Sequence, residues 1–142
     1  FKQYAVDDMV RQVIRKYAKI FISKKIKMNF KPTGRYIVTD DKWFVFVLEQ
    51  LISNALKYTK KGQISIYMKE KSLVIEDTGI GIPAEDLPRI FEKGFTGYNG
   101  RENKKSTGIG LYLCKNIMDK LQWNITVDSE VGSGTKIYLT KM

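Results

Sequence analysis

Residues 74–83 read Val-Ile-Glu-Asp-Thr-Gly-Ile-Gly-Ile-Pro, and they constrain the architecture more than any other segment. An apolar run ends at Asp77, and Gly79 and Gly81 let the backbone that follows turn sharply and approach a ligand closely. A half-buried carboxylate at a strand end can accept a charge-assisted hydrogen bond from an exocyclic amine such as N6 of adenine. Guanine presents an oxygen there and would be rejected. The alternative is structural: Asp77 caps a turn and Pro83 starts a short helix.

The segments on either side of this motif carry helical and strand patterns. A first amphipathic helix is predicted over residues 5–22, where apolar side chains recur at helical spacing: Val6, Val10, Val13, Tyr17 and Ile20. A second helix, capped by Asp40 or Asp41, runs to about Tyr58, and a third runs from about Thr107 to Leu121. Strands are predicted at residues 26–31, 35–39, 63–68, 72–76, 124–129 and 135–140. A turn at residues 32–34 joins the first two strands, and residues 77–107 hold at most short helices.

Three helices with about six mostly hairpin-connected strands predict an α+β fold. We expect a two-layer α/β sandwich, in which a mixed, mostly antiparallel sheet of five or six strands is covered on one face by the three helices. The length of 142 residues suits one domain spanning residues 1–142, and 43% apolar with 28% charged residues indicates a globular chain.

The composition excludes several kinds of chemistry. There is no histidine, so the chain contains no Ser-His-Asp triad and no histidine-based zinc site or acid–base pair. The single cysteine, Cys114, can form neither an internal disulfide nor a cysteine metal cluster, which fits a reducing compartment.

Because the chain begins at Phe1 rather than at methionine, we expect it to be part of a longer protein. No apolar run approaches the ~20 residues of a membrane helix, and the charged start does not resemble a signal peptide. Any membrane anchor is therefore expected outside these residues.

The second predicted helix carries three polar side chains on one face. Gln50, Asn54 and Lys57 are spaced by four and three residues, with apolar residues on both flanks. An amide oxygen beside a lysine suits Mg²⁺ bridged to phosphate, because Mg²⁺ prefers oxygen ligands and lysine supplies a point charge. The alternative is an ordinary solvated helix face.

A second glycine-rich segment, Ser106-Thr107-Gly108-Ile109-Gly110-Leu111, opens the third predicted helix. Free backbone N–H groups at a helix N-terminus form a phosphate cradle, and the basic residues 95–105 before it suit a lid over a polyanion. A tight turn and a solvated loop are the structural alternatives. Gly79-x-Gly81-x-x-Ala84 formally matches the dinucleotide-binding pattern, but no crossover helix and second acidic strand end follow it, and the Walker motif is absent.

Taken together, the order of these motifs resembles the catalytic, ATP-binding domain of bacterial sensor histidine kinases, within the superfamily shared by gyrase, chaperone and mismatch-repair ATPases. Gln50-x-x-x-Asn54-x-x-Lys57-Tyr58 resembles the N box and Asp77-x-Gly79-x-Gly81 the G1 box. The F box, the G2 box and the last glycine motif correspond to residues 90–95, 107–111 and 132–135. Residues 92–97 and 110–114 further resemble the intramembrane-sensing kinases of Gram-positive bacteria that answer antimicrobial peptides such as bacitracin.

The resemblance implies roles by position, with ATP and Mg²⁺ as cofactors. Asn54 would hold Mg²⁺, with Gln50 as a further candidate, Lys57 would contact phosphate, and Asp77 would bind the adenine amine. The remaining nucleotide-binding positions are Tyr58, Gly79, Gly81, Ile82, Phe91, Phe95, Arg101, Thr107, Gly108, Ile109, Gly110, Leu111 and Thr135. Ser106 stands where many relatives carry a further glycine, which would stiffen the hinge of the lid.

Position 50 distinguishes branches of this superfamily. In the members that hydrolyse ATP, an acid four residues before the metal-binding asparagine activates water, whereas Gln50 cannot accept a proton as a general base. Glu49 is adjacent but points about 100° away around the helix. The residues therefore favour a protein-histidine kinase domain that transfers phosphate to an imidazole, a reaction that asks mainly for positioning and charge neutralisation. An ATP-hydrolysing or serine-kinase member of the superfamily is the alternative.

The resemblance also implies partners and location. The acceptor histidine would lie on a dimerisation domain outside this chain, so the isolated fragment is expected to be monomeric and inactive in autophosphorylation. The full-length kinase would be a homodimer that serves a response regulator and a peptide transporter. The fragment would be the cytoplasmic domain of a multi-pass cell-membrane protein.

The net charge of +10 raises a different possibility, a module that binds nucleic acid or another anionic surface. A basic patch is predicted from Lys24, Lys25, Lys27, Lys31, Lys60 and Lys61. No nucleic-acid motif accompanies these lysines, and we expect no nucleic-acid partner. A location of the patch near an anionic membrane leaflet is the milder form of this hypothesis.

Overall fold

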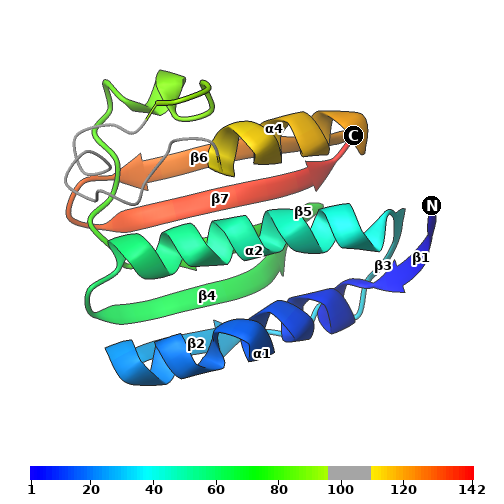
Figure 1. The fold of residues 1–142 in the computed structure, drawn as a ribbon, viewed down its shortest axis with the longest axis horizontal. Helices are drawn as coiled ribbons and strands as arrows, with labels where there is room; N and C mark the ends of the chain where they lie inside the picture. The colour runs from blue at the N-terminus through cyan, green and yellow to red at the C-terminus, as the bar shows by residue number, and fades with distance from the viewer. Residues whose placement is uncertain (96–109) are drawn as a thin grey trace.

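The computed structural model describes residues 1–95 and 110–142, which form a helical layer on one face of a sheet (Figure 1). The helices are α1 (Val6–Lys24), α2 (Asp41–Tyr58) and α4 (Gly110–Lys120). A short 3₁₀ helix, η1 (Leu87–Arg89), comes before α4 in the chain. Among the described residues no helix is both long and apolar enough to cross a membrane.

The main sheet has five strands in the order β2-β4-β5-β7-β6. These are β2 (Ile26–Phe30), β4 (Gly62–Lys69), β5 (Ser72–Asp77), β6 (Trp123–Glu130) and β7 (Gly134–Lys141). The pair β2–β4 is parallel, and the other three neighbouring pairs are antiparallel. The predicted mixed, mostly antiparallel sheet under three helices is therefore confirmed.

The predicted pairing of the first two strands is wrong. β2 does not form a hairpin with β3 (Tyr36–Thr39), because β3 pairs instead with β1 (Lys2–Ala5), a strand that the sequence did not predict. The connection between β2 and β3 is bound to the start of α1: Asp7 accepts hydrogen bonds from the backbone of Thr33 (2.9 Å) and Gly34 (3.1 Å) and from the Thr33 hydroxyl (2.7 Å). These bonds direct the chain away from β2 and toward the N-terminus.

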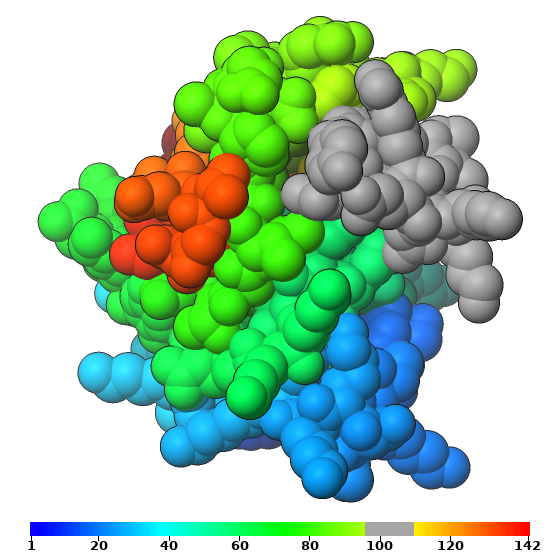
Figure 2. Space-filling view, turned by 90° about the vertical axis from the view of Figure 1, so that its left-hand side faces the viewer, coloured from blue at the N-terminus to red at the C-terminus, as the bar shows by residue number. Residues whose placement is uncertain are grey.

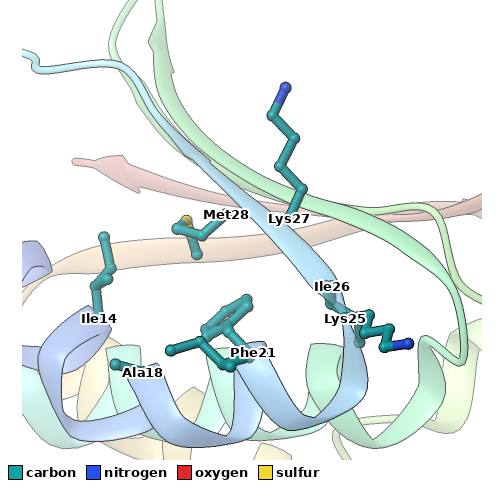
Figure 3. A pocket seen from close by; sticks show the side chains of 8 residues that line it. Ile14, Ala18, Phe21, Lys25, Ile26, Lys27 and Met28 are labelled. Atoms are coloured by element: carbon teal, nitrogen blue, oxygen red, sulfur yellow. The ribbon is translucent and has the colours of Figure 1, made fainter.

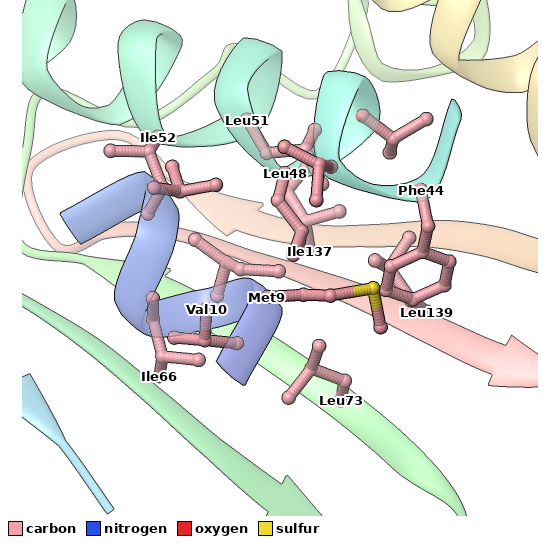
Figure 4. Packing of buried hydrophobic residues seen from close by; sticks show 14 of the residues in the cluster. Met9, Val10, Phe44, Leu48, Leu51, Ile52, Ile66, Leu73, Ile137 and Leu139 are labelled. Atoms are coloured by element: carbon pink, nitrogen blue, oxygen red, sulfur yellow. The ribbon is translucent and has the colours of Figure 1, made fainter. Parts of the chain in front are cut away.

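The core lies between the helices and the sheet (Figure 4). Phe44, Leu48 and Ile52 follow one another at four-residue spacing on α2, and each is at most 1% exposed. They pack with sheet residues such as Leu73 and Leu139, and Phe44 meets Trp123 edge to face with ring centroids 5.2 Å apart. Asp40 caps this helix as predicted, by accepting a hydrogen bond from the Trp43 backbone (3.2 Å).

One predicted core residue of α1 is exposed. Ile20 is 43% exposed, whereas Phe21 is 6% exposed and belongs to the core. The buried stripe of α1 continues from Val13 through Tyr17 to Phe21 at four-residue spacing, which leaves Ile20 outside it. The last turns of α1 thus present aliphatic side chains to solvent.

Replacing Asp7 by alanine is expected to destabilise the fold by about 1–2 kcal/mol, because two backbone N–H groups lose their acceptor. Partial burial opposes ionisation of Asp7, but the hydrogen bonds from Thr33 and Gly34 outweigh it and lower its pKa. A carboxyl whose pKa is lowered by folding stabilises the fold above its unfolded pKa of about 4 and loses that contribution as the pH falls. Urea unfolding should therefore show a difference between wild type and Asp7→Ala at pH 7 that shrinks below about pH 4. The exposed neighbour Asp8 is the control, and an equal effect of Asp8→Ala would contradict the assignment.

Cys114 is expected to resist alkylation while the protein is folded. The side chain is fully buried on α4, and burial raises the pKa of its thiol to about 12, so almost no thiolate is present at pH 8. Mass spectrometry after treatment with iodoacetamide should show unmodified Cys114 in buffer and complete modification in guanidinium. Rapid labelling of the native chain would rule out the packed position.

Candidate functional site

Four segments that are distant in the sequence meet at one end of the domain. They are the C-terminal end of α2, the residues after β5, the β6–β7 hairpin and the N-terminus of α4 (Figure 1, left). Figure 2 looks onto this end, where the orange β6–β7 hairpin lies against the green residues that follow β5. The motifs recognised in the sequence therefore come together in space, as far as the described residues extend.

Asp77 is the last residue of β5 and is half-buried. Its Oδ1 accepts a hydrogen bond from the Gly79 backbone (2.9 Å), and Thr135 lies opposite it on β7. Burial raises the pKa of Asp77, and the backbone hydrogen bonds from Gly79 and Thr135 offset this only in part. A poorly solvated carboxylate of this kind gains from any further donor that a ligand brings.

The backbone around Gly79 leaves no room for a side chain. A β-carbon at Gly79 would lie 2.4 Å from the Tyr58 carbonyl oxygen and 2.8 Å from Thr59 Oγ1. The Ile80 backbone N–H donates to the same Tyr58 carbonyl (3.1 Å), which ties this loop to the end of α2. Thr59 is fully buried, and within the described structure its hydroxyl has no hydrogen-bond partner. Backbone atoms and the Thr59 hydroxyl therefore fill the space beside Gly79, close to the Asp77 carboxylate.

The β6–β7 hairpin packs against the loop that follows β5. Gly81 has φ +78°, and a β-carbon there would lie 2.2 Å from the Glu130 carbonyl oxygen. The Gly132 N–H donates to the Ile80 carbonyl (3.0 Å). This contact runs from backbone to backbone, so glycine is required at position 81.

Ser129 joins the loop to β7 through three hydrogen bonds. Its hydroxyl donates to the Gly134 carbonyl (2.9 Å) and accepts from the Ile82 N–H (2.8 Å). Thr135 Oγ1 lies 2.8 Å from Ser129 Oγ. Because a hydroxyl has a single proton, Thr135 must donate to Ser129, which leaves the Thr135 oxygen as an acceptor only.

On α2, the three polar residues are half-buried and lie toward the same end of the domain. The Lys57 ammonium lies over the Tyr58 ring, 5.8 Å from its centroid. A β-carbon on Gly110, the first residue of α4, would lie 2.7 Å from Gln50 Oε1. Gln50 therefore contacts the start of α4, three residues beyond Thr107, while Asn54 lies one turn further along α2.

The remaining predicted residues divide into two groups. Ile82, Phe91, Phe95 and Leu111 are half-buried, and Phe91 and Leu111 pack against the core. The Arg89 guanidinium covers the Phe95 ring at 4.6 Å. Arg101, Thr107, Gly108 and Ile109 lie outside the described residues.

Thr59 and Ser129 are site residues that the sequence did not predict. Thr59 follows directly after Tyr58 in the N-box segment, so its position in the chain was a usable signal. Ser129 carried no such signal, because its partners Ile82 and Gly134 lie on other segments.

This arrangement suits a flat, amine-bearing ring beside Asp77 and a phosphate chain near Lys57. The described residues contain no cluster of three or more His, Cys, Asp or Glu placed to hold a metal ion. A divalent cation here would take the Asn54 amide oxygen together with oxygens from the ligand and water, a coordination that is usual for Mg²⁺.

Comparisons with known proteins identify the family of the chain. Residues 39–142 match the family described as histidine kinase-, DNA gyrase B-, and HSP90-like ATPase. Sensor histidine kinase YxdK of Bacillus subtilis is 37% identical over 97% of this chain and 46% of its own length. Sensor protein kinase GraS of Staphylococcus aureus is 43% identical over 73% of this chain and 31% of its own length. The chain thus spans less than half the length of these relatives.

Solved structures share the fold at low sequence identity. The catalytic domain of histidine kinase ThkA superposes with a TM-score of 0.81 at 19% identity, covering 99% of this chain and 95% of that one. The mycobacterial sensor histidine kinase MprB gives 0.79 at 20% identity, covering 97% and 94%. The match over residues 39–142 and the 37% identity to YxdK show that the chain belongs to the family of histidine kinase-, DNA gyrase B- and HSP90-like ATPases.

Proposed function

We propose that this domain binds Mg-ATP and transfers its γ-phosphoryl group to a histidine on a dimerisation domain of the same protein. The observation that carries the proposal is the half-buried Asp77 carboxylate beside Gly79, where backbone and Thr59 fill the space of a side chain. A carboxylate in this setting selects a ring with an exocyclic amine, and N6 of adenine is such a donor. Tyr58, Gly81, Ile82 and Thr135 would complete the adenine pocket, with Thr135 acting as an acceptor.

The phosphates would lie along α2 and the start of α4. Lys57 supplies a positive charge, and Asn54 would hold Mg²⁺ with oxygens of the nucleotide and water. When bound there, Mg²⁺ would supply the charge neutralisation that phosphoryl transfer requires. Gln50 contacts the start of α4 and is the second candidate near the metal. Since an amide cannot act as a general base, Gln50 favours transfer to histidine over hydrolysis by water.

By position in the chain, the lid over the nucleotide would lie between η1 and α4. Phe91 and Phe95 belong to this region, and Gly110 and Leu111 begin α4 after it. We assign Arg101 to the lid and Thr107, Gly108 and Ile109 to the phosphate cradle by position.

We further propose that the whole protein is a homodimeric sensor kinase of the cell membrane, with this domain at its cytoplasmic face. A response regulator would receive the phosphoryl group. A peptide transporter is proposed as an additional partner because residues 92–97 and 110–114 resemble the intramembrane-sensing kinases that answer antimicrobial peptides.

Calorimetry with ATP tests the nucleotide site. Wild type should bind ATP with Mg²⁺ and lose affinity in EDTA, whereas Asn54→Ala should bind weakly in both conditions. Asn124, an exposed amide on β6, provides the control, and Asn124→Ala should match wild type. Undiminished Mg²⁺-dependent affinity in Asn54→Ala would reject Asn54 as the metal ligand.

Transfer is tested on the longer protein that carries the acceptor histidine, with γ-labelled ATP. We expect an acid-labile phosphohistidine outside residues 1–142 and no label on the isolated chain. Rapid ATP turnover by the isolated chain would instead favour a hydrolase.

A further inference from the structure

The positive charge of the chain is concentrated in one segment. Residues 9–39 contain nine lysines and arginines and no aspartate or glutamate, which leaves 16 of the 25 cations for the rest of the chain with all 15 acids. Nearly the whole net charge of +10 thus resides here. We call this set the basic edge: Arg11, Arg15, Lys16, Lys19, Lys24, Lys25, Lys27, Lys31 and Arg35.

The fold displays these cations along one side of the domain. α1 and β2 lie together at the lower edge in Figure 1, and β2 is the outermost strand of the sheet. Arg11, Arg15 and Lys19 follow one another at four-residue spacing on the exposed face of α1. Lys25, which directly follows α1, and Lys27 on β2 are also exposed.

Three residues of the basic edge contact other groups within the domain. Lys16 forms an ion pair with Glu49, the one acid paired with this edge in the described structure. Lys24 donates to the Leu56 carbonyl, and the Arg11 guanidinium lies 5.4 Å from the Phe30 ring centroid.

Aliphatic side chains are exposed among the cations. Ile22 is 77% exposed and Ile20 is 43% exposed, both in the last turns of α1. Beside them lies a hollow of about 450 Å³ between α1 and β2, lined by apolar residues that include Phe21 and Met28, with Lys25 and Lys27 contributing to its wall (Figure 3). Cations with aliphatic side chains between them are the composition of surfaces that lie at a lipid interface.

We propose that the basic edge binds the surface of an anionic lipid bilayer, with Ile22 inserted between headgroups. Lysine and arginine near such a surface are attracted to the lipid charge, and an exposed isoleucine gains by leaving water. A nucleic acid would satisfy the cations but would offer nothing to Ile20 and Ile22. Protection of an edge strand against pairing explains lysines on β2, but it does not explain Arg15, Lys19 and Ile22 on α1.

Vesicle sedimentation tests the proposal. The purified chain should bind vesicles of equal parts phosphatidylglycerol and phosphatidylcholine, with affinity falling as salt rises, and should not bind pure phosphatidylcholine. The variant Arg15→Gln, Lys19→Gln, Lys25→Gln, Lys27→Gln should bind about 600-fold more weakly, since each of the four cations contributes about five-fold. The control removes four exposed cations elsewhere, Lys69→Gln, Lys71→Gln, Lys120→Gln and Lys141→Gln, and so carries the same net charge.

The control variant should lose no more than a few-fold in affinity. An equal loss in both variants would show that net charge alone acts, and equal binding to neutral vesicles would also overturn the proposal. Ile22→Ser separates lipid from other polyanions: we expect about a ten-fold loss on anionic vesicles and no change on duplex DNA. Unchanged vesicle binding by Ile22→Ser, with tighter binding to DNA than to lipid, would identify a nucleic-acid surface instead.

Discussion

Asp77→Asn is expected to weaken ATP binding by about 100-fold or more without destabilising the unliganded fold. The asparagine amide would place a donor opposite the adenine amine, so a charge-assisted hydrogen bond is replaced by a clash of two donors. The Gly79 N–H keeps its acceptor, because asparagine retains one side-chain oxygen. Function and stability should therefore respond in opposite directions to this substitution.

The stability expectation follows from the pKa of Asp77. Burial raises the pKa, so the ionised carboxylate is less favourable in the folded chain than in the unfolded chain. This cost is present at neutral pH and disappears as the pH falls below the unfolded value of about 4. Without nucleotide, Asp77→Asn should melt at the same temperature as wild type or higher at pH 7, and any advantage should shrink toward pH 4.

Glu76→Gln is the matched control, since it removes the same charge one residue earlier on β5. Glu76 accepts a hydrogen bond from the Tyr67 hydroxyl (2.6 Å), and glutamine can still do so. Calorimetry should show ATP affinity within about two-fold of wild type for this variant. A comparable loss in Glu76→Gln, or unchanged affinity in Asp77→Asn, would refute the role of Asp77.

Gly81→Ala should destabilise the fold by at least about 3 kcal/mol and abolish ATP binding. The left-handed φ of +78° costs about 1 kcal/mol for alanine, and the new methyl group would lie 2.2 Å from the Glu130 carbonyl oxygen. Relief requires movement of the β6–β7 hairpin, which also holds Thr135 and the hydrogen bond from Ile82 to Ser129.

Gly132→Ala separates the two costs. Gly132 has φ +87°, but a β-carbon there would meet no atom of the described residues within 4 Å, so only the conformational cost of about 1 kcal/mol is expected. Urea unfolding and nucleotide affinity should be measured on both variants. Similar losses of stability and affinity in the two variants would mean that backbone strain alone explains the need for glycine at position 81. The contact with the β6–β7 hairpin would then not stabilise the site.

The sequence predicted local elements better than their pairing. The four-residue and alternating patterns identified α2, β4, β5, β6 and β7, because burial on one face imposes those periods on the residues themselves. The four-residue strand β1 has too few residues for such a pattern. Its pairing with β3 depends on how Asp7 binds Thr33 and Gly34, a contact that no local period encodes.

In the candidate site, too, local motifs were easier to identify from the sequence than contacts between distant segments. Asn54 and Asp77 could be proposed as site residues from the sequence because each lies in a motif that is contiguous in the chain. The contact of Gly110 with Gln50 and the hydrogen bonds of Ser129 join distant segments, so they became visible only in the folded chain. The burial of the Thr59 hydroxyl, which has no hydrogen-bond partner among residues 1–95 and 110–142, likewise depends on the packing around it.

The backbone contact between Gly81 and the β6–β7 hairpin bears on how this site tolerates evolutionary change. The Glu130 carbonyl and the Gly132 N–H make the contact, while the side chains of Glu130 and Val131 point to solvent. Selection acting on the loop geometry therefore places no demand on the identity of those side chains. We expect positions 130 and 131 of the hairpin to diverge freely among descendants of this gene, whereas position 81 stays fixed as glycine.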